Sequence, residues 1–306
     1  MRILSLFQMK LNDIDDSMIE KIKSQGFDCI QISPVQQTKD ESSNEWWMLY
    51  QPINFSVGNK YGSKSDLKYL CERCHKKGIN VIVDVVIAHM AGENTYGSLD
   101  PNRQIDEHLR NRNSAWRRKE NIKGNEWSDR YKVTHYCMGV PGLNPNDEMV
   151  QELVINFLNE LIDLGVDGFR FDAAKSIGLP NDDDINNRSN FFPIITYCLK
   201  RPVYVIYGEV LNYPEYMINK YSKYMKVLTD VNTSDDDALV RFAETKDTFK
   251  DEQMGYTRNT SASDISNRYF DVCKNYTNSL YYRRDNWESG EWESNKVKDA
   301  NRQRKR

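Results

Sequence analysis

Short apolar runs alternate along this chain with longer segments in which apolar residues recur every three or four positions. Residues 79–87 form an almost continuous apolar run, which is typical of a strand buried on both faces. Residues 150–162 keep a helical period instead, with Asn146 placed to cap the helix and Gly165 placed to end it. Strands are predicted at residues 2–8, 27–34, 79–87, 165–175, 202–210, 225–231, 239–245 and 278–284. Because most of these eight strands are separated by helical segments, they predict an α/β fold, a (β/α)8 TIM barrel.

Two departures from the regular alternation set the predicted domain organisation. Residues 88–141 lack sustained periodicity and are rich in Asn, Arg, Trp and Gly, so they predict a loop domain inserted after the third strand. The catalytic barrel is then divided into a first part at 1–87 and a second part at 142–306. Only residues 232–238 separate the sixth strand from the seventh, which predicts a trimmed sixth unit without a full helix.

Composition narrows the class of protein. The 306 residues carry a net charge of −3, which argues against nucleic acid or an anionic membrane as a general partner. No apolar run approaches the ~18 residues of a membrane span, and no secretory leader is visible. We therefore expect a cytoplasmic protein. We also expect it to be a monomer. Cys71 and Cys74 fall on the inward stripe of a predicted helix, so they are interpreted as buried packing rather than a haem or zinc site.

Charged residues interrupt the predicted fourth strand. Arg170 and Asp172 lie two positions apart and therefore point to one face of that strand. Taken alone, such a pair is more often a structural ion pair than part of an active site. However, Asp84 lies on the third strand, Glu209 ends the fifth, and Asp247 follows the seventh. Because the C-terminal strand ends of a barrel form one rim, these residues together predict an active site.

The expected charges suit cleavage of a glycosidic bond. A contacting arginine holds a carboxylate ionised, so Asp172 is expected to stay charged beside Arg170 while Glu209 keeps a proton. Glycoside cleavage with retention requires one ionised and one protonated carboxyl group, about 5–5.5 Å apart. The pattern of charged residues therefore predicts a retaining glycosidase.

Four short segments resemble the signature segments of the α-amylase family, glycoside hydrolase family thirteen, and a fifth, at 45–55, is similar to an aromatic segment of its animal-type and related bacterial members. They are EWWMLYQPINF at 45–55, DVVIAH at 84–89, GFRFDAAK at 168–175, GEV at 208–210 and ETKD at 244–247. The resemblance implies that Asp172 is the nucleophile, Glu209 the acid/base and Asp247 the carboxylate that steadies the distorted sugar. It also implies that Arg170 orients Asp172.

The resemblance also assigns residues that contact the substrate. They are His89 and Tyr50 beside the cleaved bond, Trp46, Trp47 and Gln51 on its non-reducing side, and Lys175 on the other side. Flat aromatic rings offer apolar faces on which pyranose rings can stack. Burial beneath the inserted domain is the alternative interpretation for the two tryptophans.

Several positions depart from the family pattern. Lys246 stands where the family usually has histidine, and it adds a fixed charge beside Asp247. Ala88 and Asn144 stand where the family has calcium ligands. Because calcium takes six to eight oxygen ligands, we expect no cofactor and no metal site, with weak calcium binding left open. Thr245 falls at the family's chloride ligand, which argues against activation by chloride.

The predicted function is that of a compact, endo-acting α-amylase that cleaves α-1,4-glucans of the starch or glycogen type by double displacement. Its partner would be an α-glucan polysaccharide or a maltooligosaccharide. Two alternatives stay open, namely a 4-α-glucanotransferase that uses the same residues and a glucan-binding protein with impaired catalysis. The family's C-terminal β-sandwich domain is expected to be lacking, because the sequence ends near the eighth helix.

Overall fold

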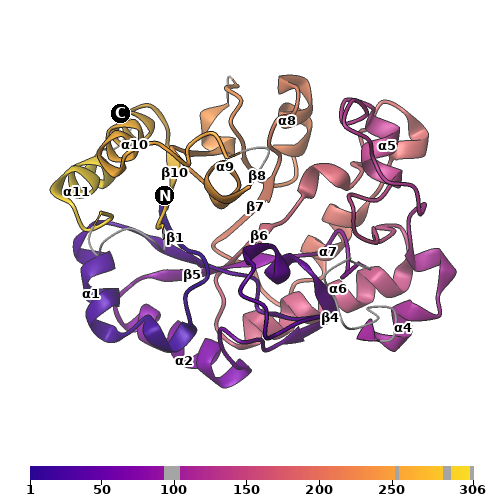
Figure 1. The fold of residues 1–306 in the computed structure, drawn as a ribbon, viewed down its shortest axis with the longest axis horizontal. Coiled ribbons are helices and arrows are strands. Elements are labelled where there is room, and N and C mark those ends of the chain that lie inside the picture. The colour runs from indigo at the N-terminus through magenta and orange to yellow at the C-terminus, as the bar shows by residue number, and fades with distance from the viewer. Residues whose placement is uncertain (93–103, 234, 252–254, 285–290, 304–306) are drawn as a thin grey trace.

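Eight parallel strands close into a barrel at the centre of the molecule (Figure 1). The computed structural model describes residues 1–92, 104–233, 235–251, 255–284 and 291–303. The barrel strands are β1 (Arg2–Leu6), β2 (Cys29–Ile32), β5 (Asn80–Val85), β6 (Gly168–Phe171), β7 (Val205–Glu209), β8 (Lys226–Leu228), β9 (Leu239–Phe242) and β10 (Asn278–Tyr282). They are joined in the order β1-β10-β9-β8-β7-β6-β5-β2, and β1 also pairs with β2. The predicted (β/α)8 barrel is confirmed, with all eight strands inside the predicted ranges.

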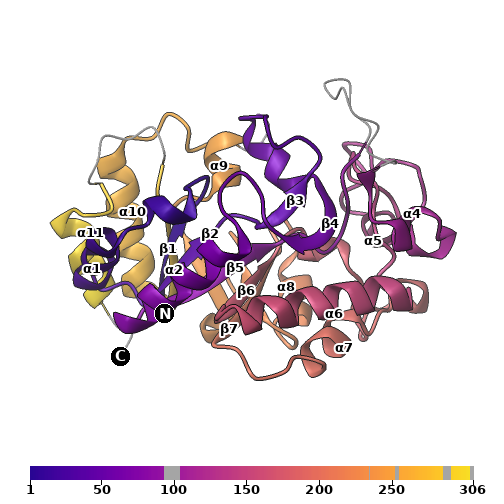
Figure 2. The same cartoon turned by 90° about the horizontal axis from the view of Figure 1, so that it is seen from below.

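Helices cover the outside of the barrel (Figures 1 and 2). They are α1 (Asp16–Ser24), α2 (Lys64–Lys76), α6 (Glu148–Asp163), α7 (Phe191–Tyr197), α8 (Glu215–Tyr221), α10 (Ala262–Asn275) and α11 (Asn295–Arg302), whereas the short α9 (Lys246–Lys250) follows β9 at the mouth of the barrel. Figure 2 shows the long α6 along one flank of the barrel, with α7 beside it. The cap of α6 is Asp147 rather than the predicted Asn146, because the Asp147 carboxylate accepts hydrogen bonds from the first backbone N–H groups of the helix.

A long segment joins β5 to α6, and its described helices α4 and α5 lie at one end of the molecule in both views. It contains α4 (Glu107–Arg110), η3 (Asn113–Ala115) and α5 (Arg130–His135). Two isolated antiparallel bridges, His89 with Gly142 and Trp116 with Leu143, join its start and middle to its end. Residues 93–103, which belong to the predicted inserted domain, lie outside the described residues. The domain boundaries at residues 88 and 141 stay a prediction.

A small antiparallel ribbon accompanies the barrel. Its strands are β3 (Gln36–Thr38) and β4 (Pro52–Val57), and the 3-10 helix η2 (Trp46–Tyr50) lies between them. The sequence did not predict these strands, because β3 has only three residues and β4 shows no strict alternation of buried and exposed positions. The ribbon carries the aromatic residues of η2 toward the barrel.

Two smaller predictions can be compared with the structure. Between β8 and β9 the described residues form only η6 (Asp236–Ala238), so the sixth unit is trimmed as predicted. Cys71 and Cys74 are buried in α2 as free thiols. Along β6, Phe171 packs outward on Phe192 of α7, with ring centroids 5.9 Å apart. In the part of the chain that the structure describes, no helix is both long and apolar enough to cross a membrane.

Candidate active site

Arg170 lies at the C-terminal mouth of the barrel, where only 1% of its surface is exposed. Its Nη1 donates hydrogen bonds of 2.7 Å to Asp84 Oδ1 and to Asp172 Oδ1. Its Nη2 donates a hydrogen bond of 2.7 Å to Glu209 Oε2. One guanidinium fork therefore gathers carboxylates from the ends of β5, β6 and β7. The structure brings Asp172 and Glu209 together within the span of a single arginine side chain.

The backbone around Glu209 is shaped to hold its carboxylate. Gly208 precedes it, and a Cβ added to this glycine would lie only 2.6 Å from the Cβ of Ala174. The missing side chain lets the turn at Ala173, which has a φ of 47°, close over the end of β7. The backbone N–H of Ala173 then donates a hydrogen bond of 3.1 Å to Glu209 Oε2. Glu209 is thus held both by a backbone N–H group and by Arg170.

The pKa values of the two central carboxyl groups, Asp172 and Glu209, are shifted in opposite directions. Burial raises the pKa of Asp172 to about 7, opposed by the charge of Arg170 and helped by that of Glu209. Burial also acts to raise the pKa of Glu209, but Arg170 and Lys246 outweigh it and lower this pKa to about 2. The directions of these two shifts run against the expectation that Asp172 is ionised and Glu209 protonated. Arg170 Nη1 is shared between Asp84 and Asp172, whereas Nη2 and the backbone N–H of Ala173 both donate to Glu209. Between pH values of about 2 and about 7, the pair nevertheless carries one proton.

Asp247 and Lys246 form the first turn of α9, directly after β9. Lys246 Nζ lies 2.7 Å from Asp247 Oδ1 and 4.2 Å from the centre of the Tyr50 ring. Burial acts to lower the pKa of Lys246, but the charge of Asp247 outweighs it and raises this pKa, so the ammonium stays charged at neutral pH. Asp247 Oδ2 is also buried, and it has no hydrogen-bond partner among the described residues.

Tyr50 and His89 line the same mouth. The hydroxyl of Tyr50 donates a hydrogen bond of 2.7 Å to Asp84 Oδ2, and its ring meets Trp46 edge-on at 6.2 Å. The backbone carbonyl of Tyr50 accepts a hydrogen bond of 2.9 Å from His89 Nε2. Burial lowers the pKa of His89 to about 4, so its ring is neutral at neutral pH. His89 Nδ1 can therefore accept a hydrogen bond, and it has no partner within the described part of the chain.

Three further predicted residues lie on or beside η2. Trp46 and Trp47 are half-buried, and the Trp46 ring meets the ring of Tyr50. Gln51 Oε1 accepts a hydrogen bond of 2.9 Å from the backbone N–H of Gly92. Gln51 therefore fixes the start of the inserted segment beside the site, a contact that the sequence did not predict.

Lys175 lies in the 3-10 helix η4 (Ala174–Ser176), which follows β6. Its Nζ donates a hydrogen bond of 3.0 Å to the carbonyl of Leu211 and lies 5.1 Å from the centre of the Trp127 ring. Trp127 belongs to the inserted segment and is 38% exposed. The sequence did not single it out, and the only signal was the high tryptophan content of residues 88–141.

The residues that stand where the family has calcium ligands, Ala88 and Asn144, do not fit a calcium ion. Ala88 has no donor side chain, and its carbonyl accepts a hydrogen bond of 2.9 Å from the Leu143 N–H. The amide of Asn144 donates a hydrogen bond of 2.8 Å to the carbonyl of Ser114. Arg117 Nε donates one of 2.8 Å to the carbonyl of Leu143, which places a cation nearby. Among the residues that the structure describes, no cluster of three or more His, Cys, Asp or Glu could hold a metal.

We therefore expect a chelator to have little effect on stability. Dialysis against EDTA should change the melting temperature by less than about 2 °C, which corresponds to under about 1 kcal/mol. Differential scanning calorimetry with and without added calcium measures this directly. A large loss on chelation that calcium alone restores would contradict the interpretation of Ala88 and Asn144.

The geometry of the site agrees with a comparison to known families. A family model described as "Alpha amylase, catalytic domain" matches residues 14–297. The chain belongs to the α-amylase family of glycoside hydrolases, family thirteen.

Individual relatives and solved structures that are similar to this chain are described as α-amylases. An α-amylase from Clostridium acetobutylicum is 36% identical over 237 residues, which are 74% of this chain and 30% of that protein. An α-amylase from Tenebrio molitor is 32% identical over 193 residues, 59% of this chain and 39% of that protein. The matches thus span well under half of these relatives. The solved α-amylase I from Eisenia fetida aligns with a TM-score of 0.78 at 18% identity, covering 94% of this chain and 67% of that one, which shows the fold alone.

Proposed function

We propose that this chain is a retaining, endo-acting hydrolase of α-1,4-glucans of the starch or glycogen type. The observation that carries the proposal is the guanidinium of Arg170, which holds Asp172 and Glu209 together at the mouth where Asp247 also lies. The names of the relatives support it. One of the similar solved structures is an α-amylase I of Eisenia fetida in complex with maltohexaose, with a TM-score of 0.77.

The chemistry would proceed in two displacements. In the first, an oxygen of Asp172 attacks the anomeric carbon, the bond to the leaving oxygen breaks, and Glu209 donates its proton to that oxygen. In the second, Glu209 takes a proton from water while the water oxygen displaces Asp172 from the anomeric carbon. Both carboxyl groups then regain their starting protonation states, and the configuration at the anomeric carbon is retained.

Binding of the glucan would place the shared proton on the correct carboxyl group. Without a glucan, Arg170 Nη2 contacts Glu209, whereas Nη1 is shared between Asp84 and Asp172, and this arrangement favours the anion at Glu209. A glucan that separates Glu209 from Nη2 would raise the pKa of Glu209, since a carboxylate that loses its cation in a buried site is destabilised. Nη1 would continue to stabilise the anion of Asp172. The proton would then reside on Glu209, where the first displacement needs it.

Two buried acceptors in the site suit a ligand that is rich in hydroxyl groups. Asp247 Oδ2 and His89 Nδ1 have no hydrogen-bond partner among the described residues. A buried acceptor without a donor costs about 1–3 kcal/mol. Sugar hydroxyls are donors of the right kind, so these atoms support contacts of Asp247 and His89 with the sugar at the cleaved bond.

Product analysis on two substrates tests the proposal. Soluble starch should lose its iodine colour before many reducing ends have formed, because internal cuts shorten the chains first. Maltotriose should be hydrolysed to shorter sugars with a net gain of reducing ends. Longer oligomers without that gain would indicate a 4-α-glucanotransferase, and starch binding without any product would indicate a glucan-binding protein.

The Lys246→His variant should extend activity to higher pH. The charge of Lys246 lowers the pKa of both Asp172 and Glu209, so a histidine that is neutral in alkali should raise the pKa at which the pair loses its last proton. The alkaline limb of kcat/KM, expected near a pH of about 7, should therefore move upward by about one unit. The pH profile of maltooligosaccharide hydrolysis measures the shift. The exposed Lys223→His variant is the control, and an unmoved or lowered limb in Lys246→His would contradict the prediction.

A further inference from the structure

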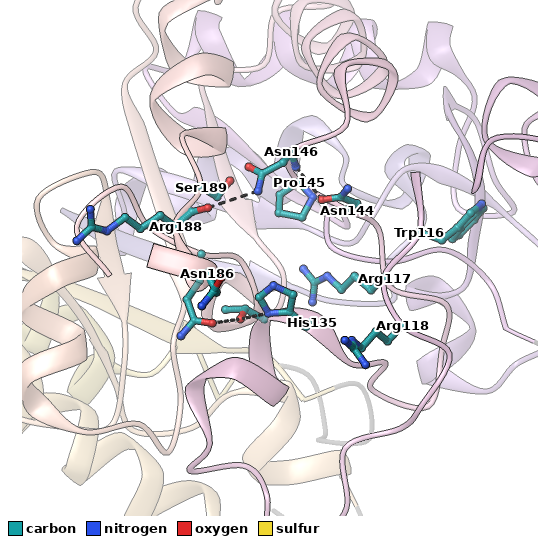
Figure 3. A pocket seen from close by; sticks show the side chains of 13 residues that line it. Trp116, Arg117, Arg118, His135, Asn144, Pro145, Asn146, Asn186, Arg188 and Ser189 are labelled. Carbon is teal, nitrogen blue, oxygen red and sulfur yellow. Dashed lines mark hydrogen bonds between the residues drawn. The ribbon is translucent and has the colours of Figure 1, made fainter. Parts of the chain in front are cut away.

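A cavity lies where the inserted segment meets the loops of the barrel. It has a volume of about 340 Å³, toward the lower end of the range for small-molecule sites. Its lining comes from residues 116–118, the end of α5, residues 144–146 and the loop around η5 (Ile185–Asn187). Figure 3 shows these segments around the cavity, which we call the Arg117 pocket. None of its lining residues belongs to the active site described above.

The charged side chains that line the Arg117 pocket are arginines, because burial lowers the pKa of His135 and leaves its ring neutral at neutral pH. The ionisable lining residues of the pocket are Arg117, Arg118, His135 and Arg188, and the described residues that line it include no aspartate or glutamate. The two buried carboxylates of neighbouring segments have other partners. Asp182 pairs with Arg130 at 2.7 Å, and Asp147 pairs with Arg112 at 2.8 Å. A concave surface of one charge attracts ions of the opposite charge.

Arg117 supplies the cation at the base of the pocket. Its Nε donates a hydrogen bond of 2.8 Å to the carbonyl of Leu143. Its Nη1 and Nη2 are both shielded from solvent and have no hydrogen-bond partner among the described residues, although the residue as a whole is only half-buried. Figure 3 shows this guanidinium directed into the pocket, between Asn144 and His135. Burial lowers the pKa of Arg117 to about 10, which leaves the group charged at neutral pH.

The wall opposite Arg117 is held in place by hydrogen bonds. Arg188 Nε donates one of 2.9 Å to the carbonyl of Asp182, and Asn146 Nδ2 donates one of 3.4 Å to the carbonyl of Arg188. At Gly178 an added Cβ would lie 1.9 Å from the carbonyl oxygen of Asn187, so only glycine permits this close approach of two loops. The pocket is therefore preformed, and a ligand would enter without reordering its wall.

We propose that the Arg117 pocket binds a phosphate-type oxyanion. The free Nη1 and Nη2 of Arg117 form the fork that pairs with two oxygens of such an anion. Arg118 and the side-chain amide of Asn144 line the same cavity and add charge and polar groups. A buried guanidinium without an acceptor is destabilising, and an oxyanion would supply the missing acceptors. The anion could be free inorganic phosphate or a phosphoryl ester carried by a sugar.

Thermal unfolding and calorimetry on the whole chain test the proposal, with inorganic phosphate, glucose 6-phosphate and glucose as probes. Inorganic phosphate should raise the melting temperature in a saturable way at constant ionic strength. Arg117→Gln should weaken phosphate binding at least about tenfold, because one charge-assisted fork is lost. The exposed Arg268→Gln on α10, at the opposite end of the molecule in both views, should bind like the parent chain.

The two phosphate probes distinguish a free anion from a sugar ester, and a second variant tests the same pocket. Glucose 6-phosphate binding more tightly than phosphate would identify the ester as the source, and equal affinities would identify the free anion. If Arg117→Gln does not fold, Arg118→Gln, whose side chain is exposed, should still weaken phosphate binding at least about threefold. No saturable effect of either phosphate probe, or parental affinity in both variants, would overturn the proposal.

Discussion

Replacing Asp172 by asparagine is expected to lower the release of reducing ends from soluble starch by at least about 1,000-fold. An amide oxygen cannot form the bond to the anomeric carbon, so the first displacement is lost. The side chain keeps its shape, and its oxygen can still accept the hydrogen bond that Arg170 Nη1 donates to Asp172. The variant should therefore fold, and the loss should lie in kcat rather than in glucan binding.

The matched control for this variant is Asp183→Asn. The Asp183 side chain is 84% exposed and contacts Lys220 on the surface. This control should keep the parental rate with soluble starch. Equal rates for the parent chain and Asp172→Asn would show that the proposed nucleophile takes no part in the reaction.

Replacing Arg170 by methionine is expected to remove activity and also to destabilise the fold. The change would leave Asp84, Asp172 and Glu209 buried together without their common cation. Removing one partner of a buried ion pair typically costs about 3–5 kcal/mol. The loss should be largest at alkaline pH and smaller near pH ~5, because unpaired buried carboxyl groups have raised pKa values and are neutralised by protonation as the pH falls. Activity of the folded fraction should fall at least about 100-fold.

A buried arginine elsewhere in the barrel provides the control. The guanidinium of Arg2 is also fully buried, but it donates to backbone carbonyls and to the hydroxyl of Ser279. Arg2→Met should therefore lower the free energy of unfolding with little dependence on pH. Urea unfolding of both variants at pH values of about 5 and 8 separates the two cases. Equal losses at the two pH values in Arg170→Met would contradict the role given to its charge.

The sequence predicted the barrel and the residues at its mouth, because both depend on periodicity and chain order. Alternation along β6 placed Arg170 and Asp172 on one face, and the ends of later strands brought in Glu209 and Asp247. The sequence could not predict which carboxylates each arm of the Arg170 fork would contact. That detail sets the direction in which the pKa of each carboxyl group is shifted, and it depends on side-chain torsions that no local pattern encodes.

Contacts formed by irregular segments could not be predicted from the sequence either. Trp127 approaches Lys175 only because the inserted segment folds back over η4. The unpartnered fork of Arg117 results from packing between that segment and residues near Leu143. Neither segment has a period from which the direction of a side chain could be inferred. Both lie in loops, where tertiary contacts decide the position of each residue.

The configuration of the first product tests the proposed mechanism most directly. Proton NMR spectra recorded immediately after mixing a maltooligosaccharide with the chain distinguish α from β reducing ends before they equilibrate. Double displacement through Asp172, with Glu209 as acid and base, predicts that the newly formed ends are α. Newly formed β ends would mean a single displacement by water, and they would contradict the proposed role of Asp172.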